Sequence, residues 1–201
     1  MKKRIKKYFI TILVGVLIGC NSNKNDFEKH DDVMIENLEH RSNLLIENFE
    51  YNSAIGVIDS IIDIMDNDSA SAFYFLQKAL LYGMINEEMK GLGSLAKYIE
   101  NSKDTNMHYY GYIVLYINLR DYQNAQKYSF NFLKKYSQFN HSTMPEYKSH
   151  TLTTAIASNV IAEYYLGRED TLNFCKYAKI VSENKDILPD SNIVKFIKIC
   201  N

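Results

Sequence analysis

The chain has 201 residues, with 23 Lys and Arg against 24 Asp and Glu, so its formal charge is −1. Five of the basic residues and none of the acidic ones lie before position 20, which leaves a formal charge of −6 in residues 20–201. This acidic balance argues against a nucleic-acid-binding protein, which carries a basic stripe, and against a basic helix lying on a membrane. Only two prolines occur, Pro145 and Pro189, which favours long helices and an all-α fold.

The N-terminal segment has the order of a secretory signal. Its basic residues precede an uncharged run over 9–18, which is shorter than the roughly 20 residues that a membrane-spanning helix needs. The ending Leu17-Ile18-Gly19-Cys20 resembles the lipobox of bacterial lipoproteins. The resemblance implies that residues 1–19 are a signal peptide that is removed and that Cys20 carries acyl chains such as palmitate. It also implies a lipid-anchored protein of the cell envelope. Asn21, rather than an aspartate, follows the cysteine and favours the outer membrane.

Residues 20–26 are polar and aperiodic, and we interpret them as the lipidated cysteine with a flexible tether. From residue 27 to residue 201 apolar residues recur at three- to four-residue multiples, which predicts helices. The length of this part predicts one domain.

Three segments of this domain align as repeats. Each has a short turn followed by the start of a second helix. At that start we align one residue of each repeat, which we call its anchor: Ala54, Met89 and Ala125, spaced by 35 and 36 residues. A fourth turn is predicted over 165–172, after an insertion at 138–150.

The repeats resemble the tetratricopeptide repeat, a helix–turn–helix unit of about 34 residues. The best match covers 119–133, whereas Gln77 and Ile113 stand where the consensus has a glycine. The resemblance implies an array of antiparallel helical hairpins, an α-solenoid, closed by a C-terminal capping helix over 190–200. An irregular helical bundle is the alternative.

Two cysteines remain once Cys20 is lipidated, namely Cys175 and Cys200. If the helices over 170–185 and 190–200 form an antiparallel hairpin, these two residues lie at equal height. Exported compartments permit disulfides, so the sequence predicts a Cys175–Cys200 bond. The alternative is a pair of free thiols in the core.

Tyrosine is the residue type that suits recognition, because it combines apolar area with a hydroxyl. Mapping the repeat onto the chain implies an inner face on the row of first helices, which in the family commonly binds extended peptides or helices. This face is predicted to hold Tyr74, Lys78, Tyr110, Asn118 and Tyr165. On the helix of Tyr110, the residues Tyr109, Tyr112 and Tyr116 share another face, which we predict to be core. The alternative is an inner face that binds nothing.

The sequence shows no recognisable set of catalytic residues. His141, Glu146 and His150 share the insertion and have zinc-ligand chemistry, but their spacing matches no zinc motif. We therefore expect no catalytic residue, no metal and no cofactor.

The sequence thus predicts a lipid-anchored helical-repeat adaptor that binds a protein or peptide partner at a bacterial envelope membrane, without catalysis and without nucleic acid. The first alternative is a ligand- or glycan-binding accessory lipoprotein of a surface uptake system. The second is a metal-dependent hydrolase that uses the insertion.

Overall fold

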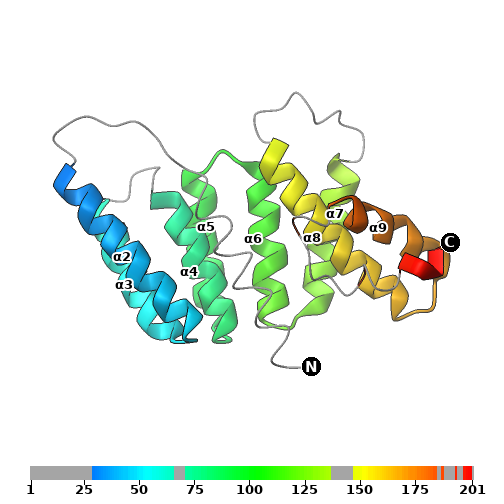
Figure 1. Cartoon of the computed structure of the whole chain (residues 1–201), viewed down its shortest axis with the longest axis horizontal. Coiled ribbons are helices and arrows are strands. Elements are labelled where there is room, and N and C mark those ends of the chain that lie inside the picture. The colour runs from blue at the N-terminus through cyan, green and yellow to red at the C-terminus, as the bar shows by residue number, and fades with distance from the viewer. Residues whose placement is uncertain are drawn as a thin grey trace. The chain divides into compact units, whose positions relative to one another are not determined.

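The computed structural model of the chain describes residues 29–65, 71–136, 147–184, 187, 193 and 197–200. Every regular element within these residues is a helix, as the sequence predicts. In chain order the elements are α2 (Lys29–Glu47), α3 (Tyr51–Ile64), α4 (Ala72–Met84), α5 (Glu88–Asn101), α6 (Thr105–Asn118), α7 (Tyr122–Tyr136), α8 (Tyr147–Leu166), α9 (Thr171–Glu183) and the short 3-10 helix η3 (Ile197–Cys200) (Figure 1).

The chain divides into two compact units between Ser102 and Lys103. In the N-terminal unit α2 packs on α3 and α4 packs on α5, and a contact of α3 with α4 joins the two hairpins. In the C-terminal unit α6 packs on α7 and α8 packs on α9, while α8 also contacts both α6 and α7. Each unit is therefore a pair of stacked helical hairpins, formed within the range for which the sequence predicts a single domain.

The same backbone turn closes each of the four hairpins. Two or three residues after the end of the first helix, one residue has a positive φ: Phe49 (65°), Asn86 (64°), Arg120 (62°) and Glu169 (59°). The next residue is acidic in every case, and its backbone N–H donates to the carbonyl five residues earlier, at 2.8–3.1 Å. This geometry defines the Schellman turn, which ends one helix with a left-handed residue. The acidic residue lies directly before the second helix, where its charge suits the helix dipole.

A closely packed position follows each turn. The fourth residue after the acidic one is buried in all four hairpins: Ala54, Gly91, Ala125 and Phe174. The anchors predicted at Ala54 and Ala125 therefore lie where two helices touch, since both side chains are 0% exposed. The anchor predicted at Met89 is wrong, because its side chain is 80% exposed and Gly91 holds the equivalent position.

Aspartates cap the second helices of the C-terminal unit. The carboxylate of Asp121 accepts the backbone N–H of Asn124 at 3.1 Å and its side-chain amide at 2.6 Å. Asp170 and Asn173 repeat the arrangement, at 3.1 and 2.8 Å. Each pair satisfies an N–H group that the first helical turn leaves without a helical partner.

The C-terminal end of the chain docks on α9. Most of the capping helix predicted over 190–200 lies outside the described residues, and its described end is η3, which packs on α9. Ile193 is 0% exposed and belongs to a core cluster with Ala162, Phe174, Ala178 and Val181. A residue from beyond α9 therefore completes the core between α8 and α9.

Candidate binding surface

Two residues of the predicted inner face are buried. Tyr74 is 6% exposed, and its hydroxyl donates a hydrogen bond of 2.5 Å to Oε1 of Glu39 on α2. Tyr110 is 2% exposed. Burial raises the pKa of both phenols, and for Tyr74 the hydrogen bond to Glu39 adds to this effect. Neither side chain is available to a partner, so the prediction of a binding role for these two tyrosines is wrong.

The physical reason is that each of their helices packs against two neighbours. Helix α4 contacts both α3 and α5, and α6 contacts both α7 and α8, so more than one face of each helix is covered. The tyrosines predicted as core on α6 are in part the more accessible ones. Tyr109 and Tyr112 are half-buried, and the ring of Tyr112 stacks on Tyr128 at 4.4 Å. Only Tyr116 of that set is buried.

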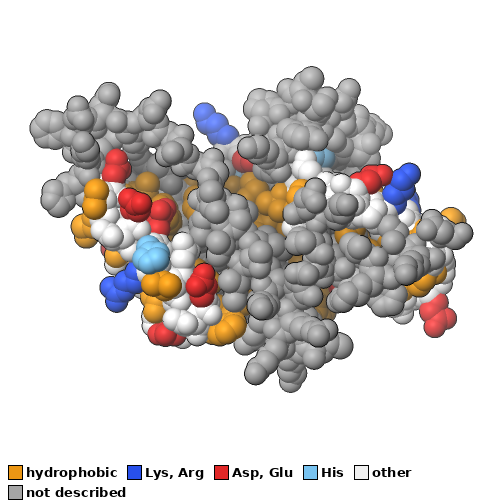
Figure 2. Space-filling view, viewed as in Figure 1, with side chains coloured by type: hydrophobic (Ala, Val, Ile, Leu, Met, Phe, Trp, Pro, Cys, Tyr) orange, Lys and Arg blue, Asp and Glu red, His pale blue; other side chains and the backbone are white. Residues whose placement is uncertain are grey.

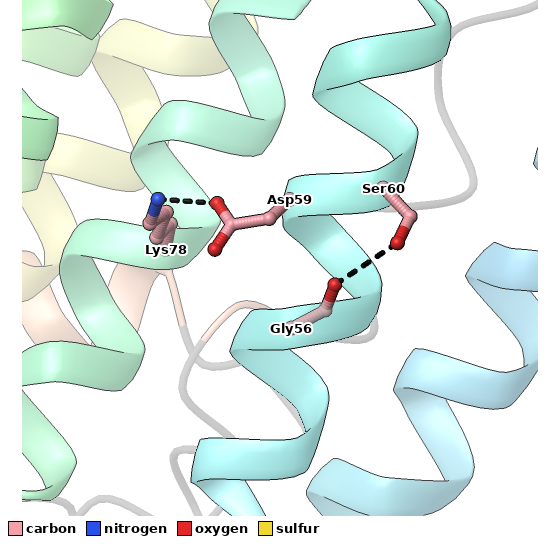
Figure 3. Close-up of polar contacts among 4 residues, drawn as sticks. All are labelled: Gly56, Asp59, Ser60 and Lys78. Atoms are coloured by element: carbon pink, nitrogen blue, oxygen red, sulfur yellow. Dashed lines mark hydrogen bonds and ion pairs between the residues drawn. The ribbon is translucent and has the colours of Figure 1, made fainter.

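Lys78 and Asn118 are held within their own units. The ammonium of Lys78 on α4 pairs with the carboxylate of Asp59 on α3, as the dashed line in Figure 3 marks. It also lies 5.8 Å from the centre of the Tyr82 ring. Asn118, at the end of α6, is half-buried. The ion pair therefore engages Lys78 within the N-terminal unit, whereas the binding role of Asn118 stays a prediction.

Tyr165 is the one residue of the predicted set that lies in an accessible aromatic group. We call this group the tyrosine cluster; it comprises Phe130 on α7, Tyr164 and Tyr165 on α8, and Tyr177 on α9, all of them half-buried. Ring centres lie 6.0 Å apart for Phe130 and Tyr164, 6.3 Å for Phe130 and Tyr165, and 5.1 Å for the two neighbouring tyrosines. Tyr165 and Tyr177 stack at 5.9 Å with only 9° between their planes. Three helices thus hold four rings together at the surface.

Two exposed cations lie on these rings. The guanidinium of Arg168 is 4.5 Å from the centre of Tyr164, and the ammonium of Lys176 is 5.5 Å from the centre of Tyr177. Such contacts are worth about 0.5–1 kcal/mol at exposed sites and hold the long side chains in place. Within the described part of the chain neither cation forms an ion pair, in contrast to Lys78 with Asp59 and Lys90 with Glu87.

The surroundings of Tyr165 raise the pKa of its phenol above the ordinary value, at which a tyrosine is already neutral near pH 7. Partial burial raises the pKa of its phenol, and the neighbouring Tyr177 and Asp170 raise it further, while Lys176 lowers it. The Tyr165 hydroxyl therefore remains a hydrogen-bond donor as well as an acceptor at every physiological pH.

A disulfide lies against the same core cluster as two rings of the tyrosine cluster. Tyr165 and Tyr177 pack against the core cluster that includes Ile193, and so do Cys175 and Cys200. The two sulfur atoms are bonded in the structure, with the Cα atoms 5.3 Å apart, which is the pairing that the sequence predicts. The disulfide ties α9 to η3 against the same core cluster.

The other predicted positions lie either outside the described residues or in the core. Cys20, His141 and Glu146 lie outside the described residues. His150 is on α8 rather than in a loop, is 6% exposed, and has its ring 5.5 Å from Phe132. The residues that the structure describes contain no group of three or more His, Cys, Asp or Glu side chains arranged to hold a metal ion. Nor does any described helix have the length and hydropathy to cross a bilayer.

Sequence reasoning missed most of the tyrosine cluster. Tyr164 lies near the end of α8 and Arg168 in the turn that follows it, so their contact depends on how that turn folds. Phe130 and Tyr177 come from neighbouring helices, and only the packing of α7, α8 and α9 brings them to Tyr165.

Comparison with known proteins gives no relative. No protein-family model matches the chain, and neither a curated protein nor a solved structure matches it. The class of protein therefore rests on the fold alone, which is an all-α array of helical hairpins.

Proposed function

We propose that the protein is a lipid-anchored helical-repeat adaptor of a bacterial envelope, held at the outer membrane through Cys20, and that it binds a protein partner through the tyrosine cluster. The observation that carries the binding proposal is the group of four half-buried rings bearing two exposed cations, Arg168 and Lys176. The anchor rests on the lipobox-like ending at residues 17–20.

The composition of the cluster suits a protein interface. Tyrosine and arginine are enriched among the residues that contribute most to protein binding, because they offer large contact areas and directed polar groups. The rings contact one another, so binding immobilises little additional side-chain freedom. Helical hairpin arrays present such surfaces on a rigid scaffold.

The alternative of a glycan ligand fits the cluster less well. A sugar stacks on an open ring face, whereas Tyr165 and Tyr177 stack on each other and Arg168 lies over Tyr164. The alternative of a metal-dependent hydrolase needs His150 as an accessible ligand, and this side chain is 6% exposed.

Site-specific photo-cross-linking in the producing cell tests the binding surface. A photoreactive amino acid replaces Tyr165 in one strain and Tyr122 in another, and Tyr122 is a matched control because it is 52% exposed on α7 outside the cluster. We expect a discrete protein adduct from position 165 and none from position 122. Identical adducts from both positions, or none from either, would rule out the cluster as the binding surface.

Cell fractionation of a Cys20→Ala variant tests the anchor. Because the thiol is the only group at position 20 to which a thioether-linked lipid attaches, we expect the variant to leave the membrane fraction and to keep its helical far-UV spectrum. A variant that is processed and sediments with the membrane like the wild type contradicts the lipoprotein proposal.

A further inference from the structure

From the charges at the tyrosine cluster we infer that the bound partner segment is acidic, with carboxylates that meet Arg168 and Lys176 and an apolar side chain against Tyr165. The inference rests on the proposed function and adds the chemistry of the partner. Its first ground is that both cations are exposed and that neither forms an ion pair with an acidic side chain of the described residues.

Arg168 is exposed as well as lying on a ring. Its contact with Tyr164, at 4.5 Å between the guanidinium carbon and the ring centre, restrains the side chain at the surface. A guanidinium carries five N–H donors, two of which a carboxylate can accept together. Lys176 above Tyr177 is restrained in the same way and retains three donors.

The distribution of charge along the chain favours the same partner. Residues 29–102 contain 5 Lys and Arg against 13 Asp and Glu, a formal charge of −8, and residues 103–201 contain 12 against 9, a formal charge of +3. On the face seen in Figure 2, acidic side chains gather over α2 of the N-terminal unit. An acidic segment is therefore repelled by the first unit and attracted by the second, which carries the tyrosine cluster.

An anionic lipid surface is the other ligand with this charge, and the observations favour it less. Lipid recognition uses clusters of four to eight Lys or Arg residues, each contributing little. The tyrosine cluster offers two, and the carboxylates of Glu163, Glu169 and Asp170 on the same helix and its turn repel negative charge that is placed anywhere else than at these two cations. Two cations held on specific rings suit two carboxylates of a defined segment better than a diffuse charged surface.

The test uses the full-length chain and a labelled peptide that alternates Glu and Leu, with binding followed by fluorescence anisotropy. We expect binding that weakens as salt rises, because exposed charge pairs are screened. The variant Arg168→Glu/Lys176→Glu is expected to bind about tenfold more weakly, since two surface ion pairs together account for about that factor. The control Lys97→Glu/Lys103→Glu makes the same change in net charge at exposed positions on neither α7, α8 nor α9 and should retain wild-type affinity.

Additional binding measurements distinguish an acidic partner segment from the alternatives. A peptide that alternates Lys and Leu should prefer the Arg168→Glu/Lys176→Glu variant over the wild type. The inference is overturned if the wild type does not bind the acidic peptide, or if the variant, folded by far-UV spectrum, binds it as well as the wild type. Binding to phosphatidylglycerol vesicles that is lost in the Arg168→Glu/Lys176→Glu variant, without peptide binding, assigns the surface to lipid instead. If position 165 still cross-links a partner whose attached segment is neutral or basic, the adaptor proposal stands and the inference of an acidic segment fails.

Discussion

Removal of the Cys175–Cys200 disulfide is expected to lower the free energy of unfolding by about 3.5 kcal/mol. The bond joins residues separated by 25 positions, and in the chain-entropy model a loop of that size removes about 12 cal/mol/K from the unfolded ensemble. At 25 °C this entropy corresponds to the stated free energy. The loss is a large fraction of the 5–15 kcal/mol that roughly spans the stability of small proteins.

The measurement is urea denaturation of the double variant Cys175→Ser/Cys200→Ser and of the wild type, followed by far-UV circular dichroism. The wild type after reduction and alkylation serves as a chemical control, and its midpoint should fall by a similar amount. Ile193 belongs to the core cluster that Cys200, Tyr165 and Tyr177 contact. Loss of the disulfide should therefore also accelerate hydrogen exchange in α9 of the variant relative to the wild type. Equal midpoints for variant and wild type, together with alkylation of both cysteines in the untreated native protein, would refute the reasoning.

Three further predictions follow from burial and capping. Tyr110→Ala should lower the free energy of unfolding by about 3–5 kcal/mol, as for other buried aromatics, while Tyr122→Ala at an exposed position should change it by less than about 0.5 kcal/mol; similar melting temperatures contradict the burial. Ala125→Leu should cost about 1–3 kcal/mol by overpacking and Gln123→Leu much less, and calorimetry that finds equal losses contradicts the hairpin contact. The hydrogen bonds that Asn173 donates lower the pKa of Asp170, so Asp170→Ala should lower the melting temperature near neutral pH. The difference should shrink as the pH falls below about 3.8 and the wild-type carboxylate becomes protonated, and a difference that does not change with pH argues against the cap.

The sequence predicts the helical hairpins well because the turns have local signals. Arg120 and Asp121 mark the third turn, and Ala125 follows at the spacing that the structure has. The second anchor is misplaced by two residues, because the near-constant spacing of the repeats selects Met89, whereas the turn that ends at Glu87 places Gly91 at the buried position. A repeat spacing that varies by two residues between hairpins is not visible until the turns themselves are located.

The binding surface was harder to predict because exposure depends on how many neighbours a helix has. The periodicity on α6 separates Tyr110 from Tyr109, Tyr112 and Tyr116, but it does not say which face is covered when two helices pack on α6. Tyr165 was identified as a surface residue through the repeat, whereas the rings around it come from three helices. Periodicity reports the faces of a single helix, and the order in which helices stack decides which faces remain open.

Substitution in the four hairpin turns is also a means of stabilising the protein. Phe49, Asn86, Arg120 and Glu169 all hold a positive φ, and none of them is glycine, the residue that adopts this conformation without steric cost. A side chain in the left-handed region costs roughly 1–2 kcal/mol, and glycine recovers this at the expense of a more flexible unfolded chain. Because Arg120 and Glu169 are exposed, glycine there gives up little packing. Engineering of these two turns is thus a way to strengthen the scaffold without replacing a ring of the tyrosine cluster, and the turn at Arg120 does so without touching the neighbour of Arg168.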